Sequence, residues 1–384
     1  MKTAFMYSDD FEQFTFREGH PLKPARFKLT YELVKAYGLF GPFHHRLIKA
    51  KPCAADDLLL AHSVEYVEAV EHAAERPSEW DGAMFGLGTP DNPIPPDIYA
   101  WSLLAVGASL QAAKLVESGE ADVAFNIAGG QHHALRSRAS GFCYFNDAAI
   151  CIQWLLNKGY QRIAYVDVDA HHGDGVQQIF YRTNRVLTIS LHETGFSAFP
   201  GTGFEREAGE EEGEGYAVNV PLLPGSDDDV FWYAFHEIVP PLLEAFRPEV
   251  LVTQLGVDAF RSDPLAKLDM TTRGFCEIIE EFKRLTPGKW IALGGGGYDV
   301  LNVPRAWTLA WAMMCGVDVP NHLPRHYVKW LKKYRLIDEH AEPQELRDQP
   351  YFTDLKTKIH LLIELEKTVS YIKNRQFKIL RMEQ

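Results

Sequence analysis

The segment YVDVDAHHGDG, residues 165–175, concentrates acidic and imidazole side chains directly after strand-forming residues. Asp167, Asp169 and His171 alternate with apolar residues, so on an extended backbone all three polar side chains point to one side. A carboxylate removed from water needs a partner or a metal ion. Carboxylate oxygens and an imidazole nitrogen suit Zn²⁺ among the divalent ions. The spacing therefore predicts a strand that binds a metal.

Such a strand needs a further ligand from elsewhere in the chain. Asp258 ends the apolar segment TQLGVD, and we expect it to complete the set begun by Asp169 and His171. Three protein ligands leave a position for water and substrate, which is typical of catalytic zinc sites. The alternative, in which DVDAHH only caps a helix, leaves the placement of Asp258 unexplained.

Other residues suited to catalysis follow other apolar segments. His132 and His133 in GGQHHA suit proton transfer near neutral pH, and the carboxylates of Asp167 and Asp174 are available to orient them. LGGGGYD lacks the Lys and Ser/Thr of a phosphate-binding loop. Its glycines instead indicate a backbone that presents Tyr298 as a hydrogen-bond donor to a developing oxyanion.

Two aromatic residues complete the pattern. Phe142 in SGFCYFND and Phe199 in SAFPGTG follow turn-like segments in which burial serves no obvious purpose. Each alone is explained by packing. Together they predict the walls of a narrow channel that admits an apolar stem and excludes water.

Five apolar segments must position these residues, and all five indicate strands: residues 122–130, 162–170, 185–193, 249–258 and 289–298. Their nearly continuous apolar runs are typical of parallel strands covered on both faces. Helical patterns lie between them, which predicts an α/β fold with a single open, mainly parallel, doubly wound sheet and helices on both faces. Each segment runs into a polar or glycine-rich cluster. Ligands bind beyond the carboxyl ends of such strands, so we expect one composite site.

Composition narrows the class of protein. The chain has 384 residues, 46% hydrophobic, and a formal net charge of −13 that argues against binding to nucleic acid. No apolar run is long enough for a membrane span, and MKTAFMYSDD does not resemble a signal peptide. Five scattered cysteines without a CxxC pair predict reduced thiols and a cytoplasmic location.

The motifs together resemble the zinc-dependent deacetylases of the histone deacetylase superfamily, which adopt the arginase/deacetylase fold. Within this superfamily the chain is similar to the bacterial acetoin-utilisation deacetylases, which are class I-like. The resemblance covers roughly residues 1–310, and its motifs occur in the family's order: REGHPLKPAR, GLGTPDNP, AGGQHHA, SGFCYFND, YVDVDAHHGDGVQ, SLHETGFSAFPGTG, GYAVNVPL, QLGVDAF and LGGGGYDV. It implies a catalytic domain over residues 1–320, and the mixed-charge helical pattern of 355–380 predicts a helical extension, residues 321–384, on the same domain.

The resemblance also implies roles for individual residues. The metal ligands would be Asp169, His171 and Asp258. The proton-transfer pair would be His132 and His133, backed by Asp167 and Asp174, with Tyr298 polarising the substrate carbonyl. The acyl-lysine tunnel would be lined by Gly141, Phe142 and Phe199. Asp91 would hold the substrate backbone at the rim, and Arg26, otherwise an ordinary ion-pairing arginine, would lie near the tunnel floor.

The family also binds monovalent cations, which implies two structural K⁺ or Na⁺ sites. The inner site would use Ser190, Leu191 and the backbones of Asp167, Asp169 and His171. The outer site would use Phe180, Thr183, Val186 and Tyr216.

The implied reaction is hydrolysis of the acetyl amide of Nε-acetyl-lysine in proteins, releasing acetate and free lysine. The acetoin-utilisation role points to acetylated acetyl-CoA synthetase as a substrate, and the same metal ligands accept Fe²⁺ as well as Zn²⁺. The sequence does not indicate an oligomeric state.

Three alternatives differ in chemistry. Arginase-like enzymes need two metals and further carboxylates at positions that hold Gly173 and Gly256 here. Acetylpolyamine amidohydrolases act on small cationic amides, but GLGTPDNP and SGFCYFND are more similar to the protein-lysine branch. A non-catalytic acyl-lysine binder would be expected to lack a ligand, a histidine or the tyrosine, and none is missing.

Overall fold

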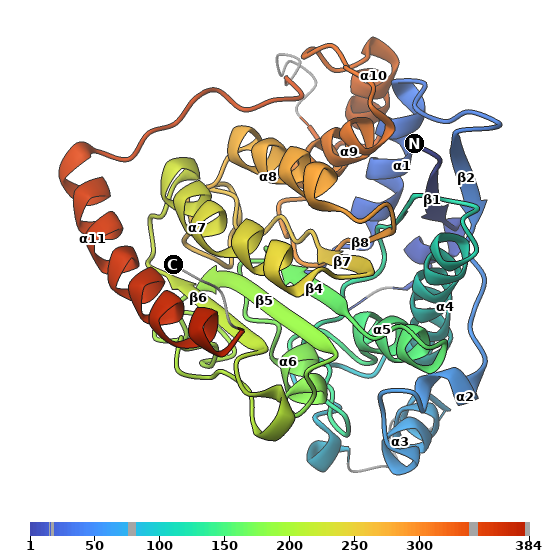
Figure 1. The fold of residues 1–384 in the computed structure, drawn as a ribbon. Helices are drawn as coiled ribbons and strands as arrows, with labels where there is room; N and C mark the ends of the chain where they lie inside the picture. Colours follow the sequence, from blue (N-terminus) through green and yellow to red (C-terminus); the bar gives the residue numbers. More distant parts are fainter. Residues whose placement is uncertain (15, 17–18, 76–81, 338–344, 381–384) are drawn as a thin grey trace.

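A central sheet organises the molecule (Figure 1). The computed structural model describes residues 1–384 except 15, 17–18, 76–81, 338–344 and 381–384. Within the described residues, eight strands pair in the order β2-β1-β3-β8-β7-β4-β5-β6, and every pairing is parallel. The strands are β1 (Thr3–Tyr7), β2 (His45–Lys49), β3 (Val123–Asn126), β4 (Ile163–Asp167), β5 (Val186–Glu193), β6 (Ala217–Leu222), β7 (Val250–Gln254) and β8 (Trp290–Leu293).

The five strands predicted from the sequence are neighbours in this sheet. They are β3, β8, β7, β4 and β5, which form its contiguous centre. Their carboxyl ends therefore lie along one edge, as expected for a single composite site. The sheet is wholly parallel, and it extends beyond the prediction by β1, β2 and β6.

Helices form a layer on each side of the sheet (Figure 1). In one layer α1, α9, α8 and α7 contact one another in turn, and in the other α4 contacts α3 and α5, which contacts α6. The helices are α1 (Ala25–Ala36), α2 (Ala55–Leu58), α3 (Val64–Glu75), α4 (Ile98–Glu117), α5 (Asp147–Asn157), α6 (Asp174–Phe180), α7 (Asp228–Phe246), α8 (Thr272–Leu285), α9 (Asn302–Cys315), α10 (Arg325–Lys333) and α11 (Leu355–Ile372). The predicted doubly wound α/β class is confirmed.

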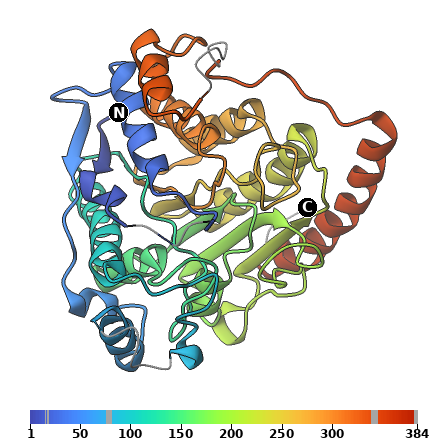
Figure 2. The same ribbon diagram turned by 180° about the vertical axis from the view of Figure 1, so that it is seen from behind.

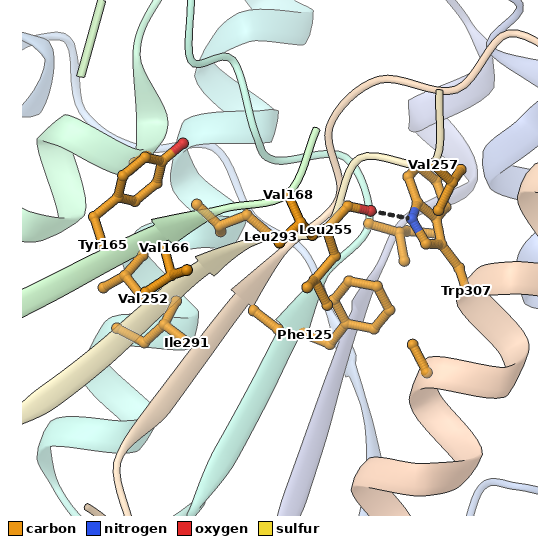
Figure 3. Close-up of a cluster of buried hydrophobic side chains, with 14 of the residues drawn as sticks. Phe125, Tyr165, Val166, Val168, Val252, Leu255, Val257, Ile291, Leu293 and Trp307 are labelled. Carbon is orange, nitrogen blue, oxygen red and sulfur yellow. Dashed lines mark hydrogen bonds between the residues drawn. The ribbon is translucent and has the colours of Figure 1, made fainter. Parts of the chain in front are cut away.

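The core between the sheet and α9 fixes the site-bearing edge (Figure 3). Phe125 of β3 and Trp307 of α9 are fully buried there, and their rings meet edge to face at 6.4 Å. The indole Nε1 of Trp307 donates to the carbonyl oxygen of Leu255 at 2.9 Å. Because this carbonyl directly follows β7, the bond satisfies a buried polar group and holds the strand end that leads to Asp258.

The predicted C-terminal helix is present as α11, followed by a π-helical turn over residues 373–377. It lies beside α7 and β6 at the margin of the sheet (Figures 1 and 2). Glu366 accepts a hydrogen bond from Tyr233 of α7, and Lys358 pairs with Asp227 at 2.8 Å. The division into 1–320 and 321–384 stays a prediction, and residues 338–344 and 381–384 lie outside the described residues.

Membrane-spanning helices and disulfide bonds are both absent from the described residues. None of the helices in the described ranges is long and apolar enough to cross a membrane. All five cysteines lie in the described part of the chain and carry free thiols. The cytoplasmic location stays a prediction.

Candidate active site

The three predicted ligands converge at the centre of the sheet edge. Asp169 and His171 follow β4 and Asp258 follows β7, which pairs with β4. One ligand atom from each lies within 4.8 Å of the others, and all three residues are buried. The Nδ1 atom of His171 is 2.9 Å from Oδ2 of Asp258 and 3.3 Å from Oδ1 of Asp169. This is the one group of potential metal ligands among the described residues.

The surroundings of the three ligands fit a divalent metal. The backbone N–H of Gly296 donates to Asp169 Oδ2 at 2.7 Å, and that of Ala170 donates to Asp258 Oδ1 at 2.8 Å. These bonds orient the carboxylates but leave two buried negative charges beside one imidazole. A divalent cation would balance that charge, and two oxygens with one imidazole nitrogen are a donor set that Zn²⁺ accepts.

Glycines make room for the carboxylates. A Cβ at Gly256 would lie 1.9 Å from Asp169 Oδ2, and one at Gly296 would lie 2.0 Å from Asp258 Oδ2. A Cβ at Gly173 would lie 2.5 Å from Asp167 Oδ2. Gly173 and Gly256 are the positions at which a two-metal, arginase-like site needs carboxylates. The structure therefore gives no support to that alternative.

The histidine pair lies beside the ligands, held from behind by the two predicted carboxylates. His132 Nδ1 is 2.8 Å from Asp167 Oδ2, and His133 Nδ1 is 2.7 Å from Asp174 Oδ1. The Nε2 atoms of the two histidines lie 3.0 Å apart. With both Nδ1–H groups donating to carboxylates, one proton between the Nε2 atoms completes the pair, which then carries a single positive charge.

The two histidines have opposite pKa shifts. Burial alone would lower the pKa of His132, but the carboxylates of Asp167 and Asp169 outweigh it and raise this pKa to about 9. Burial and the nearby imidazoles of His132 and His171 hold the pKa of His133 well below its usual range. Burial raises the pKa of Asp174 to about 6. The charge of the pair therefore resides on His132.

Tyr298 is presented by the glycine loop, as predicted. Gly295 and Gly297 have φ angles of 113° and 136°, a region open to glycine and closed to most other residues. The ring of Tyr298 meets that of Phe142 edge to face at 5.7 Å. Burial raises the pKa of the Tyr298 phenol well above its usual value, so the hydroxyl stays neutral and keeps a proton to donate.

A cavity of about 200 Å³ leads to these groups. Its lining comprises His133, Gly141, Phe142, His171, Ser197, Ala198, Phe199, Leu265 and Tyr298. Gly141 has a φ of 51°, and a Cβ there would lie 2.4 Å from His133 and 2.7 Å from the ring of Phe199. Only glycine at position 141 lets Phe199 approach His133 this closely, with the centres of the two rings 4.9 Å apart. Phe142 and Phe199 therefore both line this cavity, as does His133 but not His132. Its role as an acyl-lysine channel stays a prediction.

The remaining substrate-side candidates lie around this cavity. Asp91 is exposed, and its carbonyl oxygen is 3.4 Å from Nε2 of His20, a ring that packs against Phe142. Arg26 is buried and donates to the carbonyl of Gly297 at 3.0 Å, so it lies beneath the Tyr298 loop. Arg17 and Glu18, which begin the motif REGHPLKPAR, lie outside the described residues.

The candidate residues for monovalent cations form two groups. In the inner group, Asp167 and Ser190 are partners in the β4–β5 pairing, and Leu191 follows Ser190. The outer group lies where α6 ends and β5 begins, with Thr183 N–H donating to the Phe180 carbonyl at 3.2 Å. Val186 starts β5, and Tyr216 directly precedes β6. Cation binding at either group stays a prediction.

Several residues that support the site were not expected. The Asp147 carboxylate accepts the N–H groups of Gly130 and Gln131, which fixes the turn before the histidine pair. The Asp263 carboxylate accepts the N–H of Tyr298 at 2.7 Å and that of Leu265 at 2.9 Å. In the sequence both look like ordinary loop or cap acids, because the N–H groups that donate to them lie far along the chain or in loops without a pattern.

His172 is the one histidine of the opening segment without a predicted role. Its Nδ1 lies 2.8 Å from the hydroxyl of Thr202, and its Nε2 lies 3.1 Å from Oε1 of Gln177. Both ring nitrogens are thus occupied by neighbouring side chains away from the cavity, as expected of a structural residue.

Comparison with known proteins gives a consistent result. The histone deacetylase domain matches residues 20–314. The acetoin utilization protein AcuC of Bacillus subtilis is 40% identical over 343 residues, which cover 86% of this chain and 87% of that protein. Histone deacetylase B of Dictyostelium discoideum is 37% identical over 366 residues, covering 93% of this chain and 86% of that protein.

Solved structures agree in fold as well as in sequence. The crystal structure of an HDAC homolog complexed with SAHA superimposes with a TM-score of 0.87 at 35% identity, covering 97% of this chain and 100% of the other. That of an HDAC homolog from Aquifex aeolicus gives a TM-score of 0.86 at 33% identity, with the same coverage. A domain match over most of the chain, relatives near 40% identity and this shared fold lead to one conclusion: the chain belongs to the histone deacetylase family and is similar within it to the AcuC proteins.

Proposed function

We propose that this protein hydrolyses the acetyl amide of Nε-acetyl-lysine in proteins, using a divalent metal held by Asp169, His171 and Asp258. Deacetylase activity is supported by the family and by the AcuC relatives. The observation that carries the protein-lysine proposal is the cavity of about 200 Å³, whose lining contains Phe142, Phe199 and His171, one of the three buried ligand residues.

The cavity suits a long apolar stem that ends in an amide. Phe142, Phe199 and Leu265 supply apolar walls, and the carboxylates of Asp169 and Asp258 are buried. At the exposed rim, Asp91 would accept hydrogen bonds from the backbone of a peptide substrate. These features together favour lysine in a polypeptide over a free cationic amide.

Each group in the site would have a separate role in hydrolysing the amide. A bound divalent ion supplies Lewis acidity, polarising the amide carbonyl and lowering the pKa of water. The neutral phenol of Tyr298 donates a hydrogen bond to the oxyanion that develops on the substrate. His133, which lines the cavity, takes the proton of the attacking water and returns a proton to the lysine amine. His132 stands behind it and supplies positive charge across the 3.0 Å contact.

The carboxylates of Asp167 and Asp174 fix the tautomer and the ring orientation of His132 and His133. Asp167 and Asp174 would keep the Nδ1 proton of each ring, which leaves the Nε2 atoms for proton exchange. In this proposal the ion is Zn²⁺, and Fe²⁺ is an alternative that the same three ligands accept in its place. K⁺ or Na⁺ would bind at the two cation groups, and acetylated acetyl-CoA synthetase would be a protein substrate.

The test measures acetate release from an acetyl-lysine peptide and, side by side, from acetylputrescine. Metal-stripped protein is assayed before and after addition of Zn²⁺ or Fe²⁺, with Asp258→Asn as the variant that cannot complete the ligand set. We expect release from the peptide that depends on added metal and is lost in the variant. Release chiefly from acetylputrescine would move the protein to the polyamine branch. No release from either substrate by the metal-loaded protein would refute the enzyme proposal in favour of a binder.

If the peptide is hydrolysed, acetylated acetyl-CoA synthetase is the next substrate to assay. Loss of its acetyl groups at a rate comparable to that of the peptide would support the proposed partner, whereas an inert synthetase would exclude it.

A further inference from the structure

Glu193, the last residue of β5, is a buried carboxylate that the reaction does not use. Only 2% of its surface is exposed. No ion pair to Glu193 occurs among the described residues. A carboxylate buried without a counter-charge is costly unless its oxygens are hydrogen-bonded, so its bonds show what it does there.

Its two oxygens hold two different loops. Oε1 accepts the hydroxyl of Ser197 at 2.7 Å, and Oε2 accepts the backbone N–H of Lys267 at 2.7 Å. Ser197 is two residues before Phe199, and Lys267 is two residues after Leu265. Phe199 and Leu265 both line the cavity. One side chain therefore ties together two walls of the passage that are far apart in the sequence.

The backbone of Glu193 connects this tie to the metal ligands. Its N–H donates to the carbonyl of Ala170 at 2.9 Å, and Ala170 lies between Asp169 and His171. Phe199 and Leu265 are themselves 41% and 40% exposed, so little packing holds them from outside. Glu193 thus links both walls to the segment that carries two of the ligands.

We propose that Glu193 is a positioning residue that sets the width of the passage and thereby the preference for the acetyl group over longer acyl groups. The selectivity part of this inference rests on the proposed lysine deacylation. The tie between the two wall loops stands on geometry alone and is measured separately.

The substitution Glu193→Ala removes both bonds. Glu193→Gln keeps both, because its amide oxygen accepts from Lys267 N–H and its amide nitrogen donates to the Ser197 hydroxyl, which can rotate to accept. Ser197→Ala removes one bond. Glu249→Ala is the matched control, since the Glu249 carboxylate also accepts two hydrogen bonds, here from the backbone N–H groups of Gln161 and Arg162 at the opposite edge of the sheet.

The first measurement is hydrogen–deuterium exchange by mass spectrometry on the intact protein. We expect Glu193→Ala to speed exchange in residues 195–200 and 264–268 while leaving the strands unchanged. Glu193→Gln should resemble the wild type, and Glu249→Ala should affect only its own loop. Unchanged exchange in both wall segments of folded Glu193→Ala would overturn the tie, whatever the activity.

The second measurement is kcat/KM for peptides carrying acetyl-, propionyl- and butyryl-lysine. Because a pocket fitted to within a methylene discriminates by about tenfold or more, Glu193→Ala should shift the acetyl-to-butyryl ratio by about tenfold toward butyryl. Ser197→Ala should give a smaller shift, and Glu193→Gln should restore the wild-type ratio. A merely structural residue would lower all three activities together. An unchanged ratio would overturn the selectivity role.

The two failures are distinguishable. A wild type that releases no acyl group from any peptide refutes the proposed function and with it the selectivity role, while the exchange data still decide whether Glu193 ties the two loops.

Discussion

At the scale of single residues, a substitution of Tyr298 tests the catalytic step without altering the metal ligands. Its neutral phenol lies in the cavity and has no part in the metal-ligand set. Replacing Tyr298 by Phe should lower kcat for the acetyl-lysine peptide by about 10²–10³-fold, because one oxyanion donor is lost, with KM little changed. The matched control is Tyr327→Phe, which also removes a buried hydroxyl, here one that donates to the Leu29 carbonyl. A Tyr298→Phe variant as active as that control would remove Tyr298 from the mechanism.

Gly141 tests the geometry of the passage. An alanine there would place Cβ within 2.4 Å of His133 and 2.7 Å of Phe199. We expect Gly141→Ala to lower kcat/KM about a hundredfold, since displacements near 1 Å cost that much. Gly119→Ala is the control for backbone strain alone, because Gly119 also has positive φ, at 74°, but open space around it. Equal activity of the two variants would show that the contact with His133 and Phe199 does not matter.

Most of the site's residues were predictable, and the reason is chemical. Asp169, His171 and Asp258 stand out because carboxylates at the ends of buried strands need a partner or a metal ion, and the two histidines because they are adjacent after a glycine turn. Glu193 and Asp263 were not predictable in this way. Their partners are mainly backbone N–H groups, which carry no sequence signal, and the one side-chain partner, the Ser197 hydroxyl, stands in a loop without a pattern. Only the fold reveals that these acids hold the walls and Tyr298.

At the scale of elements, the central strands were predictable and the outer ones were not. Strands such as β4 and β7 are buried on both faces and leave an apolar run in the sequence. The edge strand β2, HRLIK, is partly exposed and carries charged residues that do not differ from those of a loop. β6 contains Pro221, which argues against a central strand. The sequence pattern also does not specify strand order, which depends on contacts between distant segments.

His62 joins three elements and makes their packing sensitive to pH. It precedes α3, its Nδ1 lies 3.0 Å from the Leu135 carbonyl, and its Nε2 accepts the N–H of Asn146 at 2.9 Å, at the start of α5. These bonds require a neutral ring. Burial lowers the pKa of His62 from 6.5 to about 4.

The sign of the effect follows from proton uptake. Below pH 6.5 the unfolded chain protonates His62, whereas the native protein does so only near pH 4. Unfolding therefore takes up a proton in this window, and stability is lost as the pH falls. We expect His62→Gln to reduce the loss of unfolding free energy between about pH 7.5 and about pH 5.5 by about 1 kcal/mol. Urea unfolding of both proteins at the two pH values measures this difference, and equal losses would assign the pH dependence to other groups.

At the scale of the whole molecule, metal binding should stabilise the fold. The ligands come from the ends of β4 and β7, so an ion that binds them links two central strands only in the native state. At a hundredfold excess over its Kd, the ion should add about 2.7 kcal/mol. Thermal unfolding of metal-stripped protein with and without Zn²⁺ measures the gain as a rise in Tm. Asp258→Asn should abolish the rise, and a rise that persists in this variant would place the ion elsewhere.

The position of α11 bears on how the molecule avoids self-association. β6 is the last strand of the sheet, and its outer margin would present unpaired N–H and carbonyl groups that invite another chain to add a strand. Pro221 removes one of those donors, and α11 lies beside the strand (Figure 1). At the opposite margin, β2 carries Arg46 and Lys49, whose charges disfavour strand addition. We therefore expect α11, which lines no part of the cavity, to protect this edge of the sheet from strand addition and so from aggregation.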